Sequence, residues 1–136
     1  MNNYQDFQGF AYIAIPTDGS TNTIKLGYTT KTPKERMDRC AKGREFRIVS
    51  AVGIKKEAPH INDITALLQA VEALAHYNAI RSGLVRMISH DWMASTSSAW
   101  VSLADLLEGG IFEGLIYKAI DTIEPRLNGY LQTIKL

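Results

Sequence analysis

The first third of the chain contains two short runs of aromatic and β-branched residues separated by turn-forming residues. Residues 9–16 (GFAYIAIP) form the first run and residues 23–29 (TIKLGYT) the second. Together they predict a β-hairpin. Residues 46–54 (FRIVSAVGI) predict a third strand. Gly27 lies inside the second strand, where a glycine indicates a bulge or a close approach of another group to the backbone.

Two helices are predicted around the third strand. Residues 32–35 (TPKE) have the sequence of a capping box with proline at the first helical position, so a helix is expected from there to Gly43. Asn62 or Asp63 would cap a longer helix that ends near Gly83. Its apolar residues fall on one helical face. These residues are Ile64, Leu67, Leu68, Val71, Leu74 and Ala75.

The second half of the chain has a less regular pattern. Residues 84–99 give no clear assignment. Residues 100–123 predict a short strand or turn and then a helix that is interrupted or capped near Gly109-Gly110. Pro125 ends this helix, before a turn and a last apolar segment. The order of elements predicts one α+β domain spanning all 136 residues, with a short central antiparallel sheet flanked by helices.

The composition fits one soluble domain. A chain of 136 residues with 46% hydrophobic content can bury one core, but it lacks the apolar stretch of roughly 20 residues that a membrane span needs. The N-terminus lacks the pattern of a secretory signal, so we expect a cytoplasmic protein without membrane partners. Cys40 is the single cysteine, which excludes an internal disulfide and a multi-cysteine zinc site.

Positive charge is concentrated in the first half of the chain. Residues 1–60 carry ten Lys or Arg against six Asp or Glu, a balance of +4, whereas residues 61–136 carry five against eight, a balance of −3. A basic cluster between residues 31 and 47 has a density that suits a phosphate backbone, and equally suits a solvated helix face. The cluster comprises Lys31, Lys34, Arg36, Arg39, Lys42, Arg44 and Arg47.

The first motifs resemble those of the GIY-YIG endonuclease superfamily. Residues 11–13 (AYI) match its first motif, with Tyr12 on the motif's tyrosine. Residues 25–27 (KLG) match the second motif in a branch common in phages and mobile elements. In that branch a Tyr-Thr pair and a proline-started helix follow, with an arginine nine residues past the glycine. Arg36 stands nine residues past Gly27.

The resemblance extends to about residue 107. Glu72 and His76 match a glutamate that this branch follows four residues later with a histidine. Residues 99–101 (AWV) stand where the branch has Glu-Trp-Phe, so the acid is missing. Residues 9–107 would therefore form the GIY-YIG-like core, and residues 108–136 a C-terminal helical extension.

The resemblance implies a metal-dependent DNA endonuclease that hydrolyses phosphodiester bonds, in a bacterial or phage-infected host cell. One divalent ion, Mg²⁺ or Mn²⁺, would be held by Glu72, because hard cations favour carboxylate oxygens. Arg36 would bind the phosphate through parallel hydrogen bonds. Tyr12 would help to activate the attacking water, and His76 would lie beside Glu72 one helical turn away.

Further residues are expected at this site, and some of them have an alternative role. Lys25 displaces the tyrosine of the second motif and would stabilise a phosphate, or is a solvent-facing strand lysine. Tyr28 would replace the displaced tyrosine, although residues 27 and 28 of a strand point to opposite faces. Glu113 is a rival to Glu72 as the metal ligand. Side chains expected to contact DNA are Lys31, Lys34, Arg39 and Lys42.

Two alternatives involve no catalysis. The chain would keep a GIY-YIG-like fold and bind nucleic acid or a protein, as a phage inhibitor of a host defence system would. It would otherwise be a structural subunit that buries Trp92, Trp100 and Leu106-Leu107 in a homo-oligomer. Dependence on a metal ion distinguishes the enzyme from the first alternative, because a binding protein should tolerate the loss of Glu72.

Overall fold

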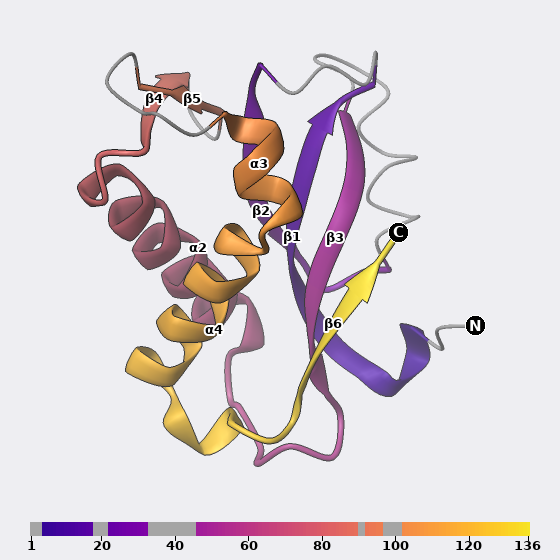
Figure 1. Cartoon of the computed structure of the whole chain (residues 1–136). Coiled ribbons are helices and arrows are strands. Elements are labelled where there is room, and N and C mark those ends of the chain that lie inside the picture. Colours follow the sequence, from indigo (N-terminus) through magenta and orange to yellow (C-terminus); the bar gives the residue numbers. More distant parts are fainter. Residues whose placement is uncertain (1–3, 18–21, 33–45, 90–91, 97–101) are drawn as a thin grey trace.

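Figure 1 shows the computed structural model, which describes residues 4–17, 22–32, 46–89, 92–96 and 102–136. Within these ranges the strands form one six-stranded sheet of order β4-β5-β2-β1-β3-β6, and neighbouring strands are antiparallel. The strands are β1 (Phe7–Pro16), β2 (Ile24–Thr29), β3 (Phe46–Lys55), β4 (Val85–Ser89), β5 (Trp92–Ser95) and β6 (Leu131–Lys135).

The three central strands agree with the sequence predictions. β1 and β2 form the expected hairpin, in which Tyr12 pairs with Gly27. β3 pairs with the other side of β1, so that Tyr12 also lies opposite Ala51. The register shifts between Ile13 and Ala14, where β3 carries one extra residue. The α+β class with a central antiparallel sheet is therefore confirmed, although the sheet is wider than expected.

The outer strands are the part that the pattern did not reveal. Residues 84–99 contain a second hairpin, β4 and β5, and β5 pairs with β2 at Ile24 and Lys25. The last apolar segment is β6, which pairs with β3 along Ser50 to Ile54. The expectation that residues 108–136 form a helical extension is thus incomplete, since this segment supplies both a helix and an edge strand of the same sheet.

The helices among the described residues pack on one face of the sheet (Figure 1). They are α2 (Ile64–Arg81), α3 (Leu103–Glu108) and α4 (Ile111–Ile123), with 3₁₀ turns η1 (Tyr4–Asp6) and η2 (Pro125–Leu127). Asp63 caps α2 by accepting a hydrogen bond from the backbone N–H of Ala66 at 3.0 Å, as one of the two predicted caps. None of these described helices is long and apolar enough to cross a membrane.

Alternation along the strands gives the sheet a helix-covered face and an opposite face. On β1, Ala11 and Ile13 point toward the helices, whereas Phe10, Tyr12 and Ala14 belong to a second apolar cluster on the opposite face. The other buried members of that second cluster are Phe7, Phe46, Ile48, Ala51, Trp92 and Ile134. We call the opposite face the aromatic face.

Glycines allow the breaks in the second half of the chain. Gly110 has a φ of +73°, a left-handed conformation that separates α3 from α4, as the Gly109-Gly110 pair predicted. Gly83 has a φ of +78° just past the end of α2. The predicted helix between residues 32 and 43, with its cap at Thr32 and Pro33, lies largely outside the described residues.

The proposed oligomer surface is mostly occupied within one chain. Trp92 is buried in the aromatic face, and Leu106 is buried in the helix-covered core. Leu107 is half-buried against the same core, and Trp100 lies outside the described residues. Trp92 and Leu106 therefore stabilise the monomer's own core rather than presenting a surface to another subunit.

Candidate functional site

The sequence-predicted site residues that the structure describes lie on both sides of the central hairpin. Tyr12 and Lys25 belong to the aromatic face. Tyr28 contacts the helix-covered core, and Glu72 and His76 lie on α2 above that same face. The two groups can meet only around an edge of the sheet, so the geometry at β2 decides whether they form one site.

Tyr12 reaches across Gly27 from β1. A Cβ placed on Gly27 would stand closer than 3.0 Å to three atoms of the Tyr12 side chain, two in the ring and the hydroxyl oxygen. The position of the Tyr12 side chain therefore requires a glycine at residue 27, which confirms the expected close approach. The Tyr12 ring stacks on Phe46, with centroids 5.9 Å apart and planes 13° from parallel. Tyr12 is 0% exposed.

Lys25 lies on the same face and does not project into solvent. It is only 9% exposed, and its Nζ stands 4.4 Å from the centroid of the Phe46 ring. Trp92 lies opposite Lys25 in the β2–β5 pair. Its ring meets the Phe46 ring edge-on, with the two centroids 6.4 Å apart. The interpretation of Lys25 as a solvent-facing strand lysine is wrong, because the residue is buried and the Phe46 ring attracts its ammonium group electrostatically.

Glu72 and His76 approach β2 from the helix side. His76 Nε2 lies 3.1 Å from the carbonyl oxygen of Leu26. Since a carbonyl only accepts hydrogen bonds, Nε2 carries the proton and donates. Glu72 Oε1 lies 3.7 Å from the same nitrogen, and both side chains are half-buried. The i,i+4 spacing predicted this pairing, but nothing in the sequence indicated the contact with Leu26.

The two groups approach consecutive residues of β2. His76 binds the carbonyl of Leu26, and the ring of Tyr12 covers Gly27. The pairing of β5 with β2 ends at Lys25, so this part of β2 lies past the end of β5. We call the group formed by Tyr12, the Leu26–Gly27 backbone, Glu72 and His76 the β2-edge site.

Tyr28 does not share the position of Tyr12. Its hydroxyl accepts a hydrogen bond from Gln69 Nε2 on α2 at 2.8 Å. The ring packs against the helix-covered core, one strand position beyond Gly27. Tyr28 therefore anchors α2 to β2 and cannot substitute for a tyrosine on the aromatic face without a change of strand register.

Most of the basic cluster falls on residues that the structure does not describe. Arg36, the expected phosphate ligand, and Lys34, Arg39 and Lys42 belong to this stretch. Lys31 is described and exposed just after β2, where its backbone N–H donates to Thr29 Oγ1 at 3.0 Å. Lys31 therefore lies near the β2 end that leads into the cluster.

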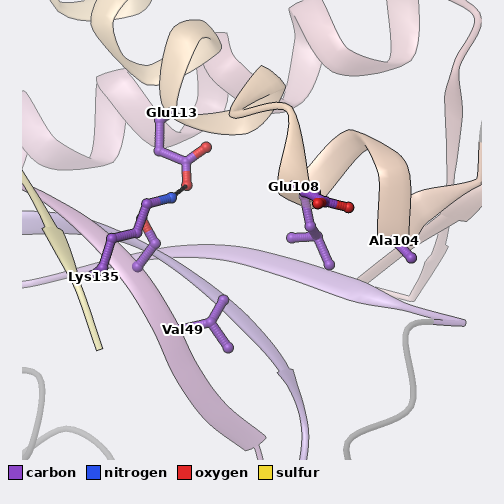
Figure 2. A pocket seen from close by; sticks show the side chains of 7 residues that line it. Val49, Ala104, Glu108, Glu113 and Lys135 are labelled. Carbon is purple, nitrogen blue, oxygen red and sulfur yellow. Dashed lines mark hydrogen bonds and ion pairs between the residues drawn. The ribbon is translucent and has the colours of Figure 1, made fainter.

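Glu113 belongs to a different part of the molecule from Glu72. It is 8% exposed near the start of α4, and its Oε1 accepts a hydrogen bond from Lys135 Nζ on β6 at 3.0 Å. Figure 2 shows this pair at one side of a pocket, with Ala104 and Glu108 of α3 at the other. Glu113 thus lies at the β3–β6 side of the sheet, and β1 lies between that side and Gly27 on β2.

The donor set at the β2-edge site suits a hard cation at one carboxylate. The side chain of Glu72 is 17% exposed, so it is partly accessible to solvent, and the Nε2 of His76 is occupied as a donor to Leu26. Across the described ranges there is no group of three or more His, Cys, Asp or Glu side chains that would enclose a metal. A metal here would accordingly take most of its ligands from water and substrate.

Comparison of the chain with protein-family models, curated proteins and solved structures gives no significant match.

Proposed function

We propose that the chain is a metal-dependent DNA endonuclease of the GIY-YIG kind, which hydrolyses phosphodiester bonds at the β2-edge site. The observation that carries this proposal is the approach of Tyr12 and the Glu72–His76 pair to consecutive residues of β2, from opposite faces of the sheet. These side chains come from β1 and α2, and their approach to neighbouring residues of β2 supports a site assembled from the resembling motifs.

Each residue has a chemical role in this proposal. Glu72 would hold Mg²⁺ or Mn²⁺, which would stabilise the negative charge that develops on the phosphate. His76 would hold α2 against β2 by donating to Leu26, and the same nitrogen lies 3.7 Å from the Glu72 carboxylate. Arg36 would bind the phosphate with a guanidinium group whose geometry matches two phosphate oxygens.

Tyr12 would orient the attacking water through its hydroxyl. Because the residue is fully buried, this role requires the packing around the Tyr12 ring to open when DNA binds. Lys25 lies on the same face beside Phe46 and would place a positive charge near the incoming backbone. The basic residues Lys31, Lys34, Arg39 and Lys42 would contact neighbouring phosphates and make binding dependent on salt concentration.

Arg36 provides a direct test of the phosphate-binding part. Arg36→Ala should lower DNA nicking in Mg²⁺ or Mn²⁺ by about a hundredfold or more, because an arginine that stabilises transition-state charge is worth that much. Arg47→Ala is the matched control, since Arg47 is an exposed arginine of β3 from the same basic cluster. Equal activity of the two variants would remove Arg36 from the site.

A second candidate is a non-catalytic protein with the same fold that binds nucleic acid or another protein. The burial of Tyr12 and Lys25 favours it, because both groups are already engaged in packing against Phe46. Such a protein should bind DNA equally well with and without a divalent ion, and Glu72→Ala should not change its affinity. Electrophoretic mobility shift with wild type and Glu72→Ala, with and without a chelator, separates the two functions.

A further inference from the structure

A pocket of about 310 Å³ lies between the helices and the β3–β6 side of the sheet (Figure 2). Its walls are apolar at Val49 of β3 and at Ala104 and Leu107 of α3. The volume is at the lower end of the range for small-molecule sites, which is about 300–1,000 Å³. The remaining lining residues are polar or charged: Ser50, Glu108, Glu113 and Lys135.

Two buried oxygens in the lining lack a hydrogen-bond partner among the described residues. They are Oε2 of Glu113, which is 92% buried as a residue, and Oγ of Ser50. Ser50 lies opposite Lys135 in the β3–β6 pair, so both polar residues border the same end of the pocket. Buried polar groups nearly always have partners, so these two oxygens are positions where a water molecule or a ligand in the pocket would complete the hydrogen bonding.

Lys135 binds one oxygen of the Glu113 carboxylate through a long, flexible side chain. Its ammonium group binds Oε1 of Glu113 at 3.0 Å, while its side chain is 66% exposed and unconstrained by packing over most of its length. Both unsatisfied oxygens are screened from solvent in this arrangement. A shift of the exposed methylene groups of Lys135, with Nζ kept on Oε1, is a small movement that would admit a ligand while the charge of Glu113 stays balanced.

We propose that this pocket binds a neutral, flat heterocycle with an amino group, of the size of a nucleobase. The amino group would donate to Oε2 of Glu113, as carboxylates accept from the amino group of cytosine in nucleic-acid recognition. Ser50 would accept from, or donate to, a neighbouring ring position. Leu107 and Val49 would cover the apolar faces of the ring.

The charges around the pocket disfavour cations and phosphate groups as ligands. The negative charge of Glu113 is already compensated by Lys135, so a cation is not needed to balance it. The carboxylate of Glu108 at the rim repels a phosphate group. A free base or nucleoside therefore fits better than a nucleotide or a base within a strand.

The test is ligand-observed NMR and calorimetric titration of the intact chain with adenine, cytosine and 1,3-dimethyluracil. The last is a flat pyrimidine without an N–H donor, and it should bind at least about tenfold more weakly than the other two. Ser50→Ala and Glu113→Gln should each weaken adenine or cytosine binding by about tenfold. Adenosine should bind more tightly than adenosine monophosphate or a short adenine oligonucleotide.

Ser50→Ala keeps the test independent of folding and of the β2-edge site. Removing an unsatisfied buried hydroxyl should leave the thermal unfolding temperature unchanged or raised. The variant should also nick DNA like wild type, because Ser50 is separated from β2 by β1. The proposal is overturned if folded wild type binds neither base at millimolar concentration, if 1,3-dimethyluracil binds equally well, or if both variants bind like wild type.

Discussion

The ring of Tyr12 on β1 lies so close over Gly27 on β2 that no side chain fits at residue 27. Tyr12 and Gly27 therefore form one close contact between β1 and β2. His76 binds the carbonyl of Leu26, the preceding residue, from the other side of the sheet. Four predictions follow from this arrangement and its neighbours.

Gly27→Ala should destabilise the fold by roughly 1–3 kcal/mol, because the added methyl group overlaps a fully buried aromatic ring. Denaturant unfolding measures this change. Gly114→Ala is the matched control: Gly114 lies within α4 with open space around its Cα, so alanine there should stabilise by roughly 0.5–1 kcal/mol. Similar effects of both substitutions would show that the Tyr12–Gly27 contact is not tight in solution.

His76→Ala should cost roughly 1–3 kcal/mol of stability, since the Leu26 carbonyl loses its hydrogen-bond donor and the helix loses an anchor to β2. Tyr77→Ala serves for comparison, because Tyr77 is adjacent on α2 and exposed. Its substitution should change stability by less than about 0.5 kcal/mol. An unfolding midpoint for His76→Ala equal to that of Tyr77→Ala would argue against the contact with Leu26.

Lys25→Met should change stability by no more than about 1 kcal/mol. The substitution loses a cation–π interaction with Phe46 but also removes the cost of burying an ammonium group, and methionine fills a similar volume. DNA affinity or cleavage should fall if Lys25 serves the substrate. A large loss of stability without any change in DNA affinity or cleavage would assign Lys25 to the core alone.

Tyr12→Phe should lower nicking by about a hundredfold or more, which is the usual contribution of a group that orients or deprotonates an attacking water. The ring and its stacking on Phe46 remain, so stability should fall by less than about 1.5 kcal/mol. Plasmid nicking together with thermal unfolding separates the two effects. Full activity of a folded Tyr12→Phe protein would exclude the hydroxyl from the reaction.

The central strands and the long helix were predictable because their sequences follow simple periods. The β1–β2 hairpin is marked by aromatic and β-branched runs, and α2 by its cap at Asp63 and its apolar stripe. The hairpin formed by β4 and β5 was missed because both strands are short and lack a clear turn signal between Ser89 and Trp92. β6 was missed as a strand because its burial depends on pairing with distant β3.

The candidate site was predictable only where local spacing determines contact. The i,i+4 spacing of Glu72 and His76 brings them together on any helix. Strand alternation places Tyr28 and Gly27 on opposite faces of the sheet. The binding of His76 to Leu26 and the burial of Lys25 against Phe46 depend on tertiary packing across long sequence separations. The partnership of Glu113 with Lys135 has the same origin and had no local signal.

The most direct test of the proposed function is nicking of supercoiled plasmid by the purified chain in Mn²⁺ or Mg²⁺, with wild type, Glu72→Gln and Glu57→Gln compared. Glu57 is an exposed glutamate in the loop after β3 and serves as the matched control. We expect metal-dependent nicking by wild type and Glu57→Gln, and none by Glu72→Gln. Equal nicking by Glu72→Gln, or no nicking by folded wild type that still binds DNA, would contradict the account.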